Sequence, residues 1–297
     1  MATLRELKGR IGSVGSSEKI TGAMKMISSA KMHKAEGALG RLLPYRNQIQ
    51  TVIGHLLSAD AQFTSPLLEA REVKRVALVV LGSDDGLCGA FNMQVFKRLL
   101  EYIRVAKEKY GTSLEITVIP IGKKMVKAVA KLADSGISLE QCNLNTRSSS
   151  VEVRDFTDDL KGRFVNKEFD RVDILYTHFC SVSRQTVEVN SLLPVSMDNL
   201  LAHSGASKPD ANKPCLFEPD AQSIFRSVLP LFILSVMQEI VTENVASEQA
   251  ARVMAMQSAN DNAKTLLEEL QLEYNKLRQQ SITTELLDII GGQSNKD

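Results

Sequence analysis

The sequence predicts an α/β protein in which long helices from the two ends of the chain form an antiparallel coiled coil with an α/β domain inserted between them. Three observations support this fold class. The stretch from Leu231 to Ile290 contains no Gly or Pro and is rich in strong helix formers. The beginning of the chain carries a matching pattern of apolar residues. Between these two segments, short apolar runs alternate with helical patterns.

The C-terminal helix is too long for an ordinary compact domain. An unbroken helix over this range would extend roughly 90 Å, whereas globular helices average about 11–12 residues. Apolar residues recur along it at steps of three and four, as in the narrow seam of a coiled coil. These seam residues are Met256, Ala259, Ala263, Leu266, Leu270, Tyr274 and Leu277. Such a seam requires a second helix.

The N-terminal segment predicts that second helix, from about Thr3 to Leu57, with a bend at Pro44. Pro230 is likewise expected to kink the chain just before the C-terminal helix. Antiparallel pairing of the two terminal helices is the simplest packing, and the alternative is that each helix binds a foreign chain. The N-terminal seam is formed by Leu4, Leu7, Ile11, Val14, Ile20, Met24 and Ile27.

The middle of the chain reads as strands alternating with helices. Strands are expected at 76–81, 116–121, 172–179 and 186–194, and helices at 93–110, 123–132 and 153–165. This alternation predicts a largely parallel sheet. The polar segment 203–214 is expected to be a loop. We therefore divide the chain into an N-terminal coiled-coil helix (1–60), an α/β domain (72–200) and a C-terminal coiled-coil helix (215–297).

A glycine-rich turn, Gly82–Asn92, follows the first strand, where a doubly wound domain can hold a nucleotide. Its spacing is G-x-x-x-G-x-x-G, which lacks the G-x-G that lets a pyrophosphate approach the backbone, and the chain has no G-x-x-x-x-G-K-[ST] phosphate loop. A tight turn between strand and helix is the simpler interpretation. The domain is therefore predicted to be Rossmann-like but not nucleotide-binding, and no cofactor is expected.

The reactive side chains do not group into a recognisable catalytic or metal site. The four cysteines are far apart without a C-x-x-C pair, and the four histidines lack metal-ligand spacing. Cys88 precedes a helix, which can lower a thiol pKa, although a small buried residue is the simpler interpretation. The sequence therefore predicts a protein that is not itself an enzyme.

Charge and polarity point to protein partners. Residues 1–45 are locally basic and should prefer an acidic surface. The C-terminal helix carries many uncharged polar residues, including Asn244, Ser247, Gln249 and Asn260, which suit either a solvated face or a wet contact with a partner. No run of about 18 apolar residues and no signal peptide is apparent, so a membrane is expected to be reached only through a partner.

Several segments resemble the γ subunit of F-type ATP synthases. They occur in the family's order and together extend over the whole chain. One departure lies at Gly291-Gly292-Gln293, where the family usually has a single Gly followed by Ala. The segments are Lys19–Met32, Gly86–Gly89, Phe217–Asp220, Ala246–Met256 and Tyr274–Leu286.

The resemblance implies the rotor of the central stalk. Its partners would be the α and β subunits of the hexamer, the ε subunit and the c-ring, with no nucleic acid. Catalysis would belong to the β subunits. The protein would be peripheral, on the cytoplasmic face of the bacterial inner membrane, and would reach the membrane only through the c-ring.

The resemblance also implies roles for individual residues. Residues that would contact or couple to the β subunits are Met24, Lys25, Arg252, Arg278, Gln279, Thr283 and Glu285. An apolar bearing tip would be formed by Leu286, Ile289 and Ile290. The foot of the stalk, near ε and the c-ring, would include Cys88 and Glu218. Two other functions stay open on the sequence: an enzyme whose helical arms serve oligomerisation, and a static coiled-coil scaffold or adaptor.

Overall fold

The computed structural model describes residues 3–57, 63–135, 137–196, 200 and 217–293. The chain divides into two compact units, one made of residues 1–29 and 252–297 and the other of residues 30–251. Two long helices, α1 (Leu4–Leu57) and α6 (Ala221–Gln293), contribute to both units. The predicted loop 203–214 lies outside the described residues.

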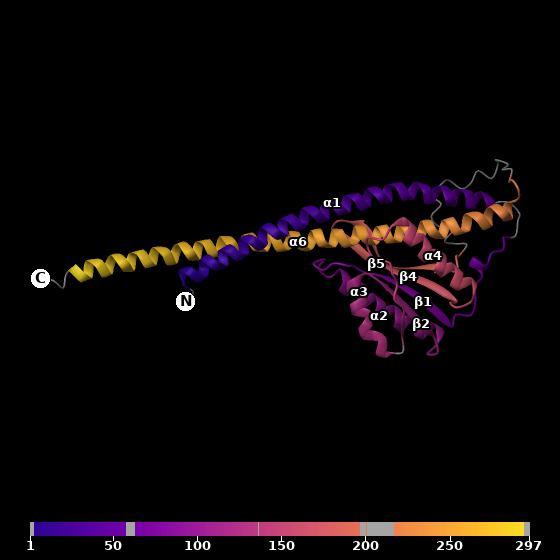
Figure 1. Ribbon diagram of the computed structural model, residues 1–297, viewed down its shortest axis with the longest axis horizontal. Coiled ribbons are helices and arrows are strands. Elements are labelled where there is room, and N and C mark those ends of the chain that lie inside the picture. Colours follow the sequence, from indigo (N-terminus) through magenta and orange to yellow (C-terminus); the bar gives the residue numbers. More distant parts are fainter. Residues whose placement is uncertain (1–2, 58–62, 136, 197–199, 201–216, 294–297) are drawn as a thin grey trace. The chain divides into compact units, whose positions relative to one another are not determined.

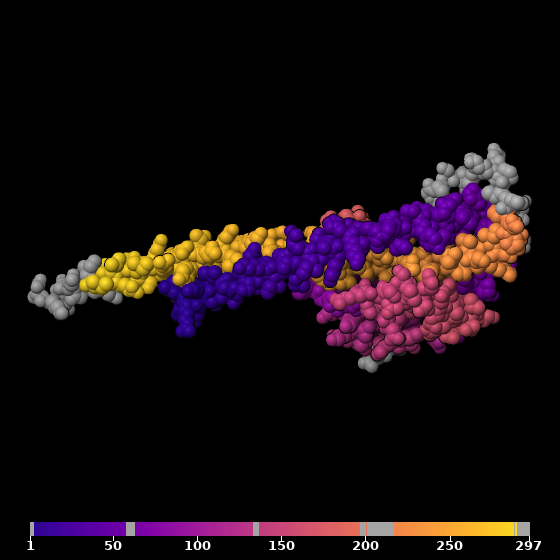
Figure 2. Space-filling model, turned by 45° about the horizontal axis from the view of Figure 1, so that its top comes forward, coloured from indigo at the N-terminus to yellow at the C-terminus, as the bar shows by residue number. Residues whose placement is uncertain are grey.

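The first unit is a pair of antiparallel helices (Figure 1). A Cβ atom placed on Gly15 would lie 3.9 Å from Leu267 Cδ2, and one placed on Gly22 would lie 3.3 Å from Asn260 Nδ2. A step of seven residues along α1, from Gly15 to Gly22, thus corresponds to a step of seven residues in the reverse direction along α6, from Leu267 to Asn260. In Figure 2 the yellow C-terminal part of α6 continues past the indigo beginning of α1.

The second unit is built on a five-stranded sheet in the order β3-β2-β1-β4-β5. The first four strands are parallel: β1 (Arg75–Leu81), β2 (Glu115–Ile121), β3 (Ser138–Leu139) and β4 (Arg171–Ser181). The last strand, β5 (Arg184–Leu193), pairs antiparallel with β4. All but the first residue of β1 are buried, as expected for a central strand covered on both faces.

Helices cover both faces of this sheet. Helices α2 (Phe91–Tyr110) and α3 (Lys123–Val129) pack on one face around a core that includes Leu99 and Met125. The other face packs against α4 (Ser150–Val165) and, within residues 30–251, against α1 and α6. Ile53 of α1 and Phe225 of α6 are completely buried in that core. The terminal helices thus form part of the α/β unit as well as a helical pair.

The predicted fold class is confirmed, with differences in detail. Both α1 and α6 continue as helices through Pro44 and Pro230, and α6 begins at Ala221, where Glu218–Asp220 were expected to open the C-terminal helical region. Strand β3 was not predicted, because its two residues form no recognisable apolar run. The helix expected at 123–132 ends at Val129 and continues as a 3₁₀ turn.

Helix α6 contains a window with mean hydropathy 1.7, long and apolar enough to cross a membrane by length and composition alone. Core-facing residues account for this hydropathy: Leu229, Phe232, Ile233 and Met237 are buried against the sheet layer of the second unit. Burial against the sheet therefore accounts for much of the apolar character of the window, in which 44% of the residues are buried.

Candidate functional site

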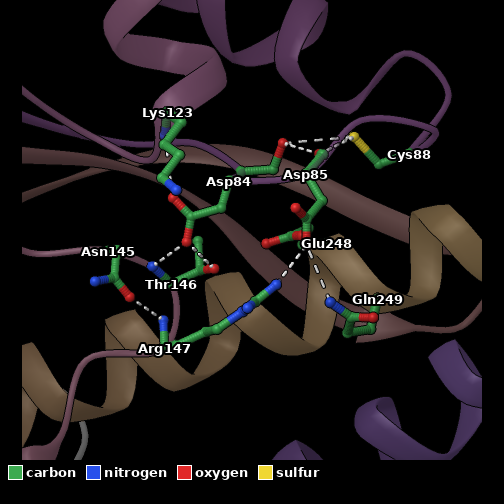
Figure 3. A network of polar contacts seen from close by, with 10 residues as sticks. Asp84, Asp85, Cys88, Lys123, Asn145, Thr146, Arg147, Glu248 and Gln249 are labelled. Carbon is green, nitrogen blue, oxygen red and sulfur yellow. Dashed lines mark hydrogen bonds and ion pairs between the residues drawn. The ribbon is translucent and has the colours of Figure 1, made fainter.

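A polar network closes the carboxyl end of the parallel strands in the second unit. Asp84 follows β1, and its carboxylate accepts hydrogen bonds from the main-chain N of Lys123 (3.1 Å) and from the main-chain N and hydroxyl of Thr146 (2.9 and 2.6 Å). Figure 3 shows Asp84 pointing toward both residues. One side chain therefore joins the ends of β1 and β2 to the loop that precedes α4.

Hydrogen bonding outweighs burial at this carboxylate. Burial raises the pKa of Asp84. The hydrogen bonds from Thr146 and Lys123 and the nearby charge of Lys123 together lower it by a larger amount, so the net pKa lies below its usual value. Asp84 is ionised at neutral pH, and its oxygens are used by the chain's own donors.

The glycine-rich turn is packed tightly against the neighbouring loop. A Cβ atom on Gly82 would lie 2.5 Å from Met125 Cβ, and one on Gly122, where φ is 98°, would lie 2.9 Å from Ser83 O. Asn92 also accepts from the main-chain N of Ser83 (3.1 Å) and donates to its hydroxyl (2.7 Å). These contacts occupy the place where a doubly wound domain would hold a phosphate, and they favour the tight-turn interpretation.

The surface of this turn is formed by Leu87 and not by Cys88. Cys88 is 3% exposed, and its sulfur lies 3.3 Å from Asn92 Nδ2. Leu87 is 62% exposed and has a φ of 63°, a left-handed conformation that is unusual for leucine. Strained, exposed residues of this kind concentrate at functional sites. The sequence prediction named Cys88 at this turn, and the structure buries Cys88 while exposing its neighbour Leu87; a pattern of residues does not reveal φ.

Part of the uncharged polar face of α6 binds the chain's own sheet. Asn244 accepts from Thr177 N (3.2 Å) and donates to Gly82 O (3.3 Å), while Ser247 donates to Thr177 O (2.9 Å). Glu248 and Gln249 are also buried. The expectation that Asn244, Ser247 and Gln249 form a solvated face is therefore wrong: Asn244 and Ser247 bind β4 and the residue after β1, and Gln249 is buried beside Glu248.

The seam of the helical pair differs from the predicted one. Leu266 is 44% exposed, whereas its neighbour Leu267 is the residue beside Gly15. Asn260 is only 9% exposed, and its amide donates to Glu18 O at 2.8 Å. The seam thus shifts by one residue at two heptads, and it contains a buried amide that the apolar pattern could not reveal.

An exposed apolar stripe lies on α1. Ile20, Met26 and Ile27 are 59%, 70% and 57% exposed. Predicting Ile20 and Ile27 as seam residues was wrong, because the helix turns Thr21 and Ser28 inward instead: Ser28 is 3% exposed, and Thr21 lies 3.4 Å from the Asn260 amide. Exposed apolar residues close together on one helix are typical of a partner-binding surface.

The proposed coupling residues differ in how far they reach the surface. Arg278, Gln279, Thr283 and Glu285 are exposed, Met24 and Lys25 are half-buried, and Arg252 is 5% exposed. Lys25 and Arg252 carry positive charge, but only Lys25 has surface available to an acidic partner. Arg252 therefore has a different setting from the four exposed residues further along α6.

The end of α6 lies beyond its intrachain partner. The register set by Gly15 and Gly22 brings Leu4, the first residue of α1, opposite Arg278, so later turns of α6 have no α1 residue beside them within the described part of the chain. Leu286 and Ile289 are 54% and 63% exposed. The side chain of Ile290 lies outside the described residues. Leu286 and Ile289 thus form an apolar helix end without an α1 cover among the described residues, and its role as a bearing tip stays a prediction.

The remaining predicted foot residue, Glu218, is exposed just before α6. Across the described ranges, no group of three or more His, Cys, Asp or Glu side chains is arranged to hold a metal ion. The distinctive features of the described molecule are thus its exposed apolar and polar surfaces and its buried hydrogen bonds between elements.

Comparison with known proteins gives the family. A family model described as ATP synthase matches residues 3–295. The ATP synthase gamma chain of Bacteroides thetaiotaomicron is 39% identical over 301 residues, covering 98% of this chain and 99% of the relative. The gamma chain of Cupriavidus pinatubonensis is 35% identical over 301 residues and covers 98% of this chain and 99% of its own.

Solved structures share the fold. A chain in the structure of the Euglena gracilis mitochondrial ATP synthase, solved with OSCP, F1 and c-ring, has a TM-score of 0.64 at 20% identity, covering 98% of this chain and 94% of that one. A chain of the Tetrahymena thermophila central stalk and c-ring has a TM-score of 0.56 at 21% identity, covering 81% of this chain and 99% of that one. Full-length family and sequence matches together lead to one conclusion: the chain belongs to the ATP synthase gamma-chain family.

Proposed function

We propose that this chain is the rotor subunit of the central stalk of a proton-translocating F-type ATP synthase. In this role it couples rotation of the c-ring to conformational change in the catalytic β subunits. The main supporting observation is the end of α6, where polar Arg278, Gln279, Thr283 and Glu285 and apolar Leu286 and Ile289 are all exposed. Such a helix end suits enclosure by partner subunits.

The mechanism depends on asymmetry. One shaft cannot make the same contacts with three β subunits at once, so each β subunit meets a different face. A contact shifts a conformational equilibrium only by the difference in its free energy between the two conformations. Rotation then moves each β subunit through its conformations in turn, and the catalytic sites themselves belong to β.

The other partners follow from the same role. The α/β unit is the foot, which carries Glu218 and the Leu87–Cys88 turn and meets the ε subunit and the c-ring. The protein is then peripheral, on the cytoplasmic face of the bacterial inner membrane, and reaches the membrane through the c-ring. In this proposal, residues 1–60 and 215–297 form the coiled-coil shaft, and residues 72–200 form the foot.

Torque transmission through α6 can be tested with Ala259→Pro. Proline removes a backbone hydrogen bond and kinks the helix. We expect proton-driven ATP synthesis by the reconstituted complex to be lost, while Ala259→Ser, which keeps the backbone bond, retains it. Wild-type synthesis by the proline variant would contradict the rotor mechanism.

Rotation separates a rotor from a static scaffold. Cys180 is exposed and Cys88 is buried, so a variant that retains only Cys180 is suited to attaching a bead. We expect ATP-driven rotation of the bead on the immobilised complex. A stationary bead on a complex that hydrolyses ATP would favour the scaffold, and nucleotide turnover by the isolated chain would favour the enzyme.

A further inference from the structure

A groove in the second unit is lined by α1, the β4–β5 hairpin and α6. It has a volume of about 780 Å³, and we call it the interhelical groove. Glu36 and Gln50 of α1 both line it, so it follows that helix for roughly 20 Å. A groove of this size is in the range of small-molecule sites.

Two buried polar atoms in the groove lack a hydrogen-bond partner. Gln50 is 2% exposed, yet no donor among the described residues reaches its Oε1. Arg46 Nε is likewise buried without an acceptor in the described part of the chain, although the same guanidinium pairs with Glu239. Only Gln50 Oε1 is an acceptor that lacks a donor, whereas Arg46 Nε lacks an acceptor. An unsatisfied buried acceptor costs about 1–3 kcal/mol, so an N–H group that reached Gln50 Oε1 would stabilise a complex.

The charge of the groove is acidic. Its lining includes four carboxylates, of which Glu239 pairs with Arg46 and Glu243 pairs with His178 at 2.9 Å. Glu36 is bonded to the exposed His33 at 2.8 Å, and Glu188 accepts from Thr186 Oγ1 at 3.0 Å. Glu188 thus has no cationic partner within the described chain, and the acidic groups outnumber Arg46 and His178.

Apolar side chains also line the groove, among them Leu39, Leu43 and Val236. A matching ligand has an ammonium group for Glu188 and Glu36, an aliphatic chain for the leucines, and a second N–H donor for Gln50 Oε1. We propose that the interhelical groove binds a linear aliphatic polyamine.

Binding can be measured by calorimetry on the full-length chain, with spermidine as the probe. We expect saturable binding that is about tenfold weaker in Glu188→Gln and about fivefold weaker in Gln50→Leu. Glu108→Gln is the matched control, because Glu108 is exposed on α2, on the opposite face of the sheet. This variant should bind spermidine like the wild type.

Two further ligands distinguish the site from general charge attraction. Butylamine, with a single ammonium group, should bind more weakly than spermidine, and Mg²⁺ at matched charge should not displace spermidine. Equal affinity in wild type, Glu188→Gln and Gln50→Leu would overturn the proposal, as would displacement by Mg²⁺ or the absence of saturable binding. Should Gln50→Leu not fold, Glu188→Gln still decides, because Glu188 is exposed.

Discussion

The side-chain amide of Asn260 donates a hydrogen bond to the main-chain oxygen of Glu18 at 2.8 Å. The same nitrogen lies 3.4 Å from Thr21 Oγ1, and Asn260 is 9% exposed. A polar residue buried at a coiled-coil seam typically fixes the register between helices at some cost in stability. We infer that Asn260 sets the register of the helical pair, which in turn determines how much of α6 extends past α1.

Asn260→Asp should destabilise the pair. The substituted carboxylate has no hydrogen to donate and would face the Glu18 carbonyl oxygen, so we expect a loss of about 1–3 kcal/mol in the free energy of unfolding. Chemical denaturation of the full-length chain measures this loss. The control is Asn262→Asp on the exposed side of the same helix, with an expected change within about 0.5 kcal/mol. Equal losses in both variants would refute the register role.

Asp84→Asn should destabilise the second unit. The amide retains one acceptor oxygen, and its NH₂ group would meet main-chain donors of Lys123 or Thr146. We expect a loss of about 1–3 kcal/mol in the free energy of unfolding. The neighbouring Asp85→Asn is the control, because Asp85 and Arg147 are 61% and 70% exposed, and a surface ion pair contributes about 0–1 kcal/mol.

The same variant tests the pH dependence at Asp84. The lowered pKa of a folded carboxylate gives stability that is present above the unfolded pKa, about 3.9, and is lost as the pH decreases through the folded pKa. Acid titration of the free energy of unfolding should therefore show a smaller loss in Asp84→Asn than in the wild type. An unchanged acid profile would contradict the charge contribution.

The fold was predictable because the long helix and the buried strand leave strong periodic signals. Val76–Leu81 is a continuous β-branched and aliphatic run, and Leu231–Ile290 lacks helix breakers. The seam was harder to predict, because Leu266 and Leu267 are equally apolar and only packing against Gly15 selects one of them. An apolar pattern also cannot assign an inward position to Asn260.

His178 should make stability depend on pH near neutrality. Burial lowers the pKa of His178. The hydrogen bond with Glu243 and the charges of Glu243, Glu188 and Glu239 raise it by a larger amount, so the net pKa lies above its usual value. These carboxylates face His178 from α6 and β5, and Arg46 of α1 lines the same groove. Burial also raises the pKa of Glu243, against the lowering effect of His178.

Both raised pKa values give the same sign of pH dependence. The contribution of His178 is fully present below its unfolded pKa of about 6.5 and is lost as the pH increases through its folded pKa. The raised pKa of Glu243 likewise favours the folded state toward lower pH. The free energy of unfolding should thus decrease above about pH 6.5, and His178→Gln should reduce this decrease. His33→Gln, at an exposed histidine of α1, is the comparison variant, and matching profiles for both variants would contradict the role of His178.

The candidate contact surface was only partly predictable, because residue type does not determine exposure. Cys88 and Leu87 are adjacent in the same motif, yet one is buried and the other exposed at positive φ. Arg252 and Arg278 are chemically identical, but only Arg278 reaches the surface. The exposure of a helical residue depends on which side of the helix packs against the partner helix. The apolar pattern of the sequence identifies that side only in part.

The exposed stripe on α1 gives a test of partner binding that is separable from folding. Ile27 is 57% exposed, so Ile27→Gln should change the free energy of unfolding of the chain by less than about 0.5 kcal/mol. If the proposed rotor function is correct and the stripe contacts the α/β hexamer, the variant should bind isolated α and β subunits about tenfold more weakly, because an apolar contact is replaced by a polar one. Leu100→Gln on α2, where Leu100 is 43% exposed in the second unit, should assemble normally. Normal assembly of both variants would show that the stripe is not part of the contact surface. The rotor function would then still be tested separately by the bead-rotation measurement.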